Sequence, residues 1–193
     1  MLALDMTSLK CTNQLRQDTR YSLGASASFD VRAFPAFTAG LVGGRVGLDG
    51  ALGRWAGASL DGVILRGSTR DPLGSVDLAA YGAGATLGVR SGSAPRARFG
   101  VRGDALWTVA TGVPANADVV ATSGARLVLT LGVEARLDVP LGEATYGTVS
   151  VLAGGVMRGL YGRADDRTAA GVAGPMVGVA VGGALDVCCA PQR

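Results

Sequence analysis

Residues 122–140, TSGARLVLTLGVEARLDVP, alternate between apolar and polar side chains, and this pattern restricts the folds open to the chain. The apolar positions are Leu127, Leu129, Leu131, Val133, Ala135, Leu137 and Val139. A β-strand points successive side chains to opposite faces, so the segment has one apolar face and one polar, charged face. A helix, with a period of about 3.6 residues, would mix Glu134, Arg136 and Asp138 among the leucines. The pattern therefore predicts a strand.

The predicted strand is long for a water-soluble domain. Strands in soluble proteins usually have about 5–6 residues, whereas about 9–11 residues tilted by ~45° cross the hydrocarbon of a bilayer. Similar alternation recurs from residue 20 to residue 188, in eight candidate strands without a convincing helix. Consecutive strands with short connections favour an antiparallel meander, and an even number can close into a barrel that has no unpaired edges.

Some features between the strands are less regular. The apolar face that starts near residue 20 is interrupted around Ala33–Pro35 and switches parity at Gly43-Gly44, where we expect a β-bulge. The connections near 50–53, 91–95 and 140–144 are short. Those near 67–74, 112–121 and 162–168 are expected to be longer loops. Short turns on one rim and long loops on the other are typical of transmembrane barrels.

The composition excludes several kinds of active site. The 193 residues contain no histidine, which removes Ser-His and Cys-His nucleophiles, imidazole bases and most zinc ligand sets. The three cysteines lack the spacing of a metal site. The net charge is only +3 and the basic residues are scattered, so no electrostatic footprint for nucleic acid is present. We therefore expect no catalytic residue, no metal, no cofactor and no nucleic acid partner.

In its alternation, strand length and loop asymmetry, the chain resembles small bacterial outer-membrane β-barrels over residues 20–188. The resemblance implies an all-β, antiparallel up-and-down barrel of about eight strands that spans the outer membrane of a Gram-negative bacterium and contacts membrane lipid. Residues 1–19 are then an N-terminal tail and residues 189–193 a C-terminal tail. The implied role is structural, or that of a narrow pore for small solutes, without enzymatic activity. No partner protein is indicated.

Two other kinds of barrel fit parts of the pattern. A soluble lipocalin-like barrel that binds an apolar small molecule would show the same alternation turned inside out. However, the polar face is mostly Gly, Ala, Ser and Thr with small mixed groups of charges, whereas a water-facing surface usually has about 25–35% charged residues. A barrel enzyme acting on envelope lipids is disfavoured because histidine is missing.

The charged residues of the polar face are expected inside the barrel, where buried charges must pair to offset their desolvation. We place seven arginines there: Arg32, Arg45, Arg98, Arg102, Arg126, Arg136 and Arg158. We also place seven carboxylates there: Asp30, Asp49, Asp61, Asp104, Glu134, Asp138 and Asp186. The predicted structural network in the lumen consists of Arg98, Arg102, Asp104, Arg126, Glu134, Arg136, Asp138 and Arg158.

The positions of the cysteines suggest a disulfide. In a closed meander the first and last strands are neighbours, and both chain ends lie at the same rim. Cys11 precedes the first strand and Cys188 ends the last, so a flexible tail could bring them within the ~5.5 Å Cα separation that a disulfide requires. The alternative is that all three thiols remain reduced.

Overall fold

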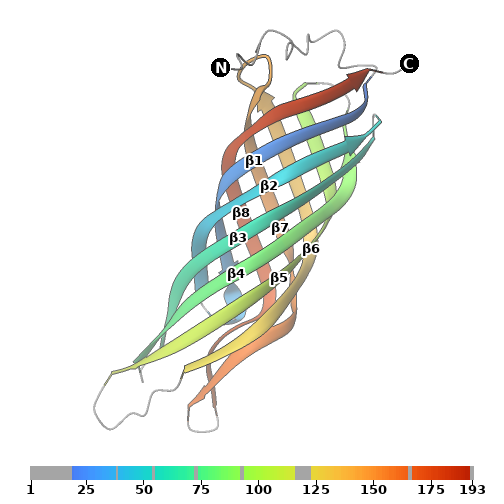
Figure 1. Cartoon of the computed structure of the whole chain (residues 1–193). Coiled ribbons are helices and arrows are strands. Elements are labelled where there is room, and N and C mark those ends of the chain that lie inside the picture. The colour runs from blue at the N-terminus through green and yellow to red at the C-terminus, as the bar shows by residue number, and fades with distance from the viewer. Residues whose placement is uncertain are drawn as a thin grey trace, which may run out of the picture.

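The computed structural model describes residues 19–37, 39–53, 55–71, 74–91, 94–115, 123–164 and 167–191. Within these ranges the chain forms a closed antiparallel barrel in sequential strand order, with the first strand paired to the last (Figure 1). The strands are β1 (Thr19–Phe34), β2 (Ala39–Leu52), β3 (Ala56–Asp71), β4 (Gly74–Arg90), β5 (Arg96–Pro114), β6 (Ser123–Pro140), β7 (Thr145–Ala164) and β8 (Arg167–Pro191). The all-β, eight-stranded up-and-down barrel predicted from the alternation is confirmed.

The two rims of the barrel differ in which connections they carry. The start of β1 and the end of β8 lie at one rim, here called the terminal end (Figure 1). The opposite rim, here called the loop end, carries the connections after Phe34, Asp71, Pro114 and Ala164. The last strand continues to Pro191, beyond the residue 188 expected from the sequence.

Two of the expected long loops at the loop end are wrong. Ladder pairing continues through the predicted 67–74 loop as far as the Asp71–Gly74 pair, and through the predicted 162–168 loop as far as the Ala164–Arg167 pair. Strand pairing uses backbone groups, so polar side chains do not end it. Polarity alone was therefore a poor guide to where these strands stop.

The turn between β1 and β2 corrects a further expectation. The chain turns through the short 3₁₀ segment η2 (Pro35–Phe37), and β1 and β2 then pair without a register shift. The predicted bulge at Gly43-Gly44 is therefore wrong. The parity switch arises because Leu41 faces the lumen while Val46 faces outward, and both are apolar. No helix in the described ranges is long and apolar enough to cross a membrane.

The pairing register measures how the strands are staggered around the barrel. A path across hydrogen-bonded partners that starts at Leu127 of β6 returns to the same strand at Leu137, ten residues further along (137 − 127). The path visits Trp107, Tyr81, Ile64, Gly44, Phe29, Val181 and Val149. Such a stagger tilts the strands. Partners therefore lie progressively nearer the loop end from β1 to β6.

The outer wall of the barrel is apolar. Large hydrophobic side chains on several strands are more than half exposed, including Phe29 (59%), Ile64 (65%) and Leu87 (68%). The outward face of β6 carries Leu131, Val133, Leu137 and Val139, all exposed, as its alternation predicted. Because the largest apolar patch on a soluble monomer is usually only ~300–600 Å², an apolar wall on this scale marks a surface that contacts something other than water.

Candidate functional site

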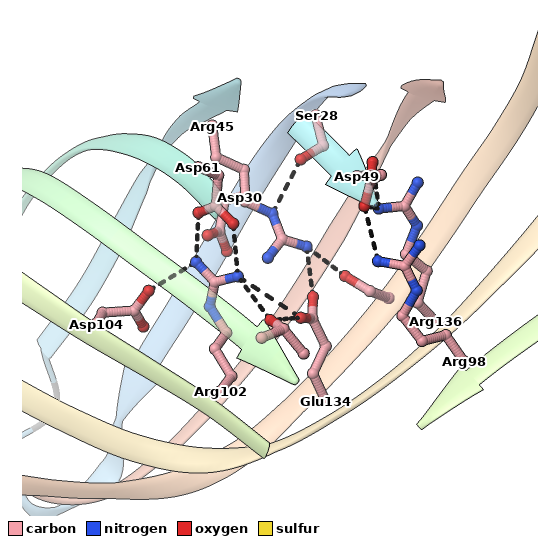
Figure 2. Close-up of polar contacts among 12 residues, drawn as sticks. Ser28, Asp30, Arg45, Asp49, Asp61, Arg98, Arg102, Asp104, Glu134 and Arg136 are labelled. Carbon is pink, nitrogen blue, oxygen red and sulfur yellow. Dashed lines mark hydrogen bonds and ion pairs between the residues drawn. The ribbon is translucent and has the colours of Figure 1, made fainter. Parts of the chain in front are cut away.

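The lumen is the part of the molecule where charged side chains gather, and Arg102 of β5 lies at the centre of the gathering (Figure 2). Its guanidinium forms two parallel bonds to Asp61 of β3, with Nη2 2.6 Å from Oδ2 and Nη1 2.9 Å from Oδ1. Nη2 also donates to Asp104 Oδ1 at 2.6 Å, and Nη1 lies 3.6 Å from Glu134 Oε2. The side chain of Arg102 is 1% exposed. A paired fork of this kind is among the stronger polar contacts in proteins.

A second arginine extends this cluster toward β1. Arg32 Nη1 donates to Asp104 Oδ2 at 2.7 Å, and its Nη2 donates to Asp30 at 3.0 Å. Asp104 therefore bridges two guanidinium groups, and it also accepts a bond of 3.0 Å from the Thr130 hydroxyl. These three bonds use most of the acceptor capacity of a carboxylate that is only 4% exposed.

A third arginine crosses the lumen between β2 and β6. Arg45 Nη2 lies 2.8 Å from Glu134 Oε1, and the same guanidinium donates to the hydroxyls of Ser28 and Ser150. Glu134 in turn accepts a bond of 2.9 Å from the Thr86 hydroxyl. Figure 2 shows Arg45 and Arg102 approaching Glu134 from different strands. The contact ties the two sides of the barrel together across the lumen.

The network continues toward the terminal end. Asp49 of β2 accepts bonds from Arg98 at 2.7 Å and from Arg136 at 3.0 Å. Arg136 Nε also donates to Asp138 Oδ1 at 2.6 Å. Near the rim, Arg96 pairs with Asp186 at 3.0 Å.

Two arginines near the terminal rim contact groups other than carboxylates. The guanidinium of Arg96 lies 4.4 Å from the centre of the Tyr146 ring. The guanidinium of Arg90 donates only long hydrogen bonds among the described residues, 3.4 Å to the Ser22 hydroxyl and 3.3 Å to the Gly53 carbonyl. Arg90 is therefore held more loosely than Arg102.

Glycines that face the lumen make room for these side chains. A Cβ built on Gly84 of β4 would lie 2.2 Å from both Arg102 Nη2 and Asp104 Oδ1. A Cβ on Gly47 would lie 2.6 Å from Asp61 Cβ. Real Cβ atoms do not approach other atoms this closely, so any larger residue would displace the network. The high glycine content, 31 of 193 residues, was the available sequence signal for this crowding.

Toward the loop end the lumen becomes apolar, and on β3 and β5 the change takes a single inward step. Inward-facing Asp61 is followed by Val63 and Leu65, and inward-facing Asp104 is followed by Leu106. The buried apolar cluster contains Phe34, Ala39, Leu41, Val63, Leu65, Leu78, Ala80, Leu106, Val128, Leu152, Val172 and Met176. The lumen is therefore filled by a network of charged side chains toward the terminal end and by a cluster of apolar side chains toward the loop end.

The structure brings together most of the predicted lumen residues. Arg98, Arg102, Asp104, Glu134, Arg136 and Asp138 all take part in the network described above. Two members of the prediction do not join them. Arg126 has inward parity but lies exposed on β6, loop-ward of the apolar cluster, with buried Val128 between it and the charges.

The prediction for Arg158 is wrong because of a bulge. The register of β7 against β6 shifts between the pairs Thr130–Val156 and Leu129–Arg158. Met157 and Arg158 are consequently both exposed, and Arg158 shares the outward face with its partner Leu129. A bulge changes which face the side chains beside it point to, and nothing in the local sequence marked its position.

Two lumen arginines were absent from the prediction. Arg90 shares the inward parity of Thr86, and Arg96 begins β5 directly after a turn. With these two in place of Arg126 and Arg158, the lumen as described holds seven arginines and seven carboxylates. The charge balance expected from desolvation is thus present with partly different members.

Little empty space remains between the charged side chains. Two cavities among them, one around Arg45 and Arg102 and one around Arg90 and Arg96, each have a volume of about 20 Å³. A cavity of that volume holds about one water molecule. In the described part of the chain, no group of three or more His, Cys, Asp and Glu residues could hold a metal ion.

The structure describes only one of the two cysteines of the predicted disulfide. Cys11 lies outside the described residues, and Cys188 belongs to the backbone of β8, where it pairs with Leu23 of β1. The Cys11–Cys188 disulfide stays a prediction.

Comparison with known proteins identifies the fold. No protein-family model and no curated protein matches the sequence. Among solved structures, Neisserial surface protein A matches with a TM-score of 0.52 and 10% identity, over 86% of this chain and 97% of the other. Ail, the attachment invasion locus protein of Yersinia pestis, matches with a TM-score of 0.50 and 14% identity, over 88% and 98%. At these identities the similarity establishes a shared eight-stranded barrel fold.

Proposed function

We propose that the chain is a non-enzymatic β-barrel of the outer membrane of a Gram-negative bacterium, with a closed lumen and a structural role. The observation that carries the proposal is that apolar and charged side chains lie on the opposite sides from those expected in a soluble protein. Large apolar side chains cover the outside, while Arg32 and Arg102, 0% and 1% exposed, lie inside. A barrel in water would expose its charges and bury its leucines. In a bilayer a closed barrel satisfies every backbone group and leaves an apolar wall for the lipid.

A narrow pore for small solutes is the alternative role that the sequence left open, and the filled lumen argues against it. A solute would have to pass the ion pairs around Arg102 and then the cluster around Leu65 and Leu106, both fully buried. The interior of an eight-stranded barrel is just wide enough for side chains to fill. Two blocks in series would keep the lumen closed even if one of them fluctuated.

The soluble lipocalin-like alternative is less well supported. Such a barrel needs an apolar cavity for its ligand, whereas the apolar half of this lumen is packed with its own side chains. An enzymatic role also lacks support in the described residues. Glu134 and Asp138, an example of a carboxylate pair that could do acid–base work, each form an ion pair with an arginine.

Membrane insertion can be tested by flotation. Refolded full-length chain mixed with phosphatidylcholine vesicles is expected to float with the lipid in a density gradient and to resist extraction by carbonate. Chain that stays in the aqueous fraction while retaining its β-sheet circular dichroism would contradict the membrane assignment and favour the soluble barrel.

The closed lumen can be tested on the same material by planar-bilayer recording. Inserted wild-type protein is expected to show no steady conductance. A stable open channel in the wild type would overturn the closed-lumen proposal while leaving the membrane location intact.

A further inference from the structure

The outer wall of the barrel contains a shallow apolar groove that spans β1 to β4 and the adjoining part of β8. Its raised sides are formed by Phe29, Val42, Val46, Ile64 and Tyr81. Small residues lie between them, namely Ala27, Gly44 and Gly62. Phe29, Val46, Ile64 and Tyr81 are 52–65% exposed, so no other described residue covers them.

The glycines of this groove differ from those of the lumen. A Cβ on Gly62 would meet only the Val46 carbonyl oxygen at 3.9 Å, and a Cβ on Gly44 only the Ser28 carbonyl oxygen at 3.5 Å. Both are ordinary contacts, whereas a Cβ on lumen-facing Gly43 would lie 2.0 Å from the Ile64 carbonyl oxygen. Packing therefore does not require glycine at 44 and 62. Their effect is to hollow the wall where larger side chains would fill it.

Among the described residues, one outward-facing cation lies at the loop-ward end of the groove. Arg66 of β3 is exposed, lines the groove and follows outward-facing Ile64 by two residues. Among the described residues no carboxylate pairs with it. The next outward positions toward the loop end are polar, Ser68 on β3 and Asp77 on β4, which pair with each other in the ladder.

Aromatic residues place Arg66 at the edge of the apolar wall. Tyr81 and Trp107 are cross-strand partners on β4 and β5, both exposed, and the stagger of the barrel puts them toward the loop end. Tyr and Trp concentrate where lipid headgroups begin. An arginine at that depth can keep its stem against apolar surface while its guanidinium reaches phosphate.

We propose that the groove holds one acyl chain of a phospholipid with a net negative headgroup, in the leaflet at the loop end, and that Arg66 binds the phosphate of that headgroup. The proposal rests on the membrane location proposed above. The groove supplies an apolar surface against which an acyl chain can pack. The guanidinium of Arg66 has no carboxylate partner in the described structure, and it supplies a positive charge for the phosphate. A second copy of the chain is the competing occupant, but a purely apolar interface would leave this arginine without a counter-charge.

The test is native mass spectrometry of the full-length barrel released from detergent after incubation with dioleoyl phosphatidylglycerol or dioleoyl phosphatidylcholine. The wild type is expected to retain more phosphatidylglycerol. Arg66→Gln should lower phosphatidylglycerol retention by about fivefold, the contribution of one arginine near an anionic surface, and remove the preference. Gly62→Leu should lower retention of both lipids by filling the groove, with Gly44→Leu as a second filling variant.

The matched control is Arg126→Gln, which removes an exposed arginine at the same end of the barrel but on β6, outside the groove. It should change retention by less than about twofold. Equal retention of the two lipids by the wild type, or equal losses in Arg66→Gln and Arg126→Gln, would overturn the proposal. A dimer that Gly62→Leu abolishes would instead identify a second copy as the occupant. The wild type and each variant are first checked by flotation. Failure of the wild type to float counts against the membrane location and not against the groove, whereas a variant that fails to float while the wild type floats has a folding defect and is not scored for lipid retention.

Discussion

The two halves of the lumen are built on the same strands and enclosed by the same apolar wall, but they are held together differently. In the terminal-end half each charged group depends on specific partners, as Asp104 does on Arg32, Arg102 and Thr130. In the loop-end half, side chains such as Leu65 and Leu106 need only neighbours of suitable volume. Removing one member therefore leaves an uncompensated charge in one half and a cavity in the other.

The boundary between the halves shows how abruptly a barrel interior can change. One inward step along β3 leads from Asp61 to Val63, and one along β5 leads from Asp104 to Leu106. Because charges desolvated beside the apolar cluster lack water, they must be satisfied by one another. In the closed-lumen proposal, the apolar half blocks the passage, and we infer that the charged half makes the arrangement of strands specific.

The largest expected effect comes from removing the centre of the charged half. Arg102→Met leaves Asp61 buried without an ion-pair partner among the described residues and should lower the free energy of unfolding by about 3–5 kcal/mol. Urea unfolding in lipid vesicles measures it. The double variant Arg102→Met with Asp61→Leu makes this region resemble the apolar half, and it should recover part of the loss. If the double variant were no more stable than Arg102→Met, lost packing and not an unpaired charge would explain the loss of unfolding free energy.

The apolar half should respond to lost volume alone. Leu106→Ala, at a side chain that is 2% exposed, is expected to cost roughly 2–5 kcal/mol through the cavity it leaves. Leu106→Met, which nearly conserves volume, should cost less than about 1.5 kcal/mol in the same unfolding measurement. If the methionine variant were as unstable as the alanine variant, the two halves would not differ in the way described.

The outer wall, shared by both halves, offers a third comparison. Leu131→Arg places a charge on the outer wall well inside β6. If that wall contacts lipid as proposed, the change should cost about 2–4 kcal/mol, falling to about 0–1 kcal/mol for Val139→Arg near the end of the strand. Both side chains have similar exposure, 48% and 43%, so depth is the main difference. Folding yield and unfolding free energy in vesicles measure the pair. Equal tolerance at both positions would contradict a membrane-facing wall.

The smallest effect is expected at the rim of the charged half. The Arg96 and Asp186 side chains are 18% and 13% exposed, so solvent screens their pair more than it screens the pairs of Arg102. Arg96→Gln should therefore cost only about 1 kcal/mol, including the lost contact with the Tyr146 ring. Added salt should reduce the difference from the wild type. A loss as large as that of Arg102→Met would show that the network behaves as one unit up to the rim.

The local sequence determined which residues form strands and which side chains share a face. Alternation along residues 122–140 predicted β6 and its exposed Leu131 and Val133, because a strand's side-chain period depends only on backbone geometry. The same reasoning predicted the number of strands and sequential closure, and it placed Arg102, Glu134 and Asp138 on the inward face. It could not separate the lumen from the outer wall where both are apolar, as at Leu41, Val63 and Leu65.

Only the tertiary structure decided which charges meet. Arg45 reaches Glu134 and Arg136 reaches Asp49 across a lumen whose width and stagger depend on the register of every strand pair. The bulge beside Met157, which turns Arg158 outward, is likewise set by how β7 pairs with β6. Periodicity assigns a side chain to one face of its strand. Closure of the hydrogen-bonded ladder around the whole barrel determines the position of that side chain along the barrel axis and the residue that it meets across the lumen. That closure depends on all eight strands together, so no single segment encodes it.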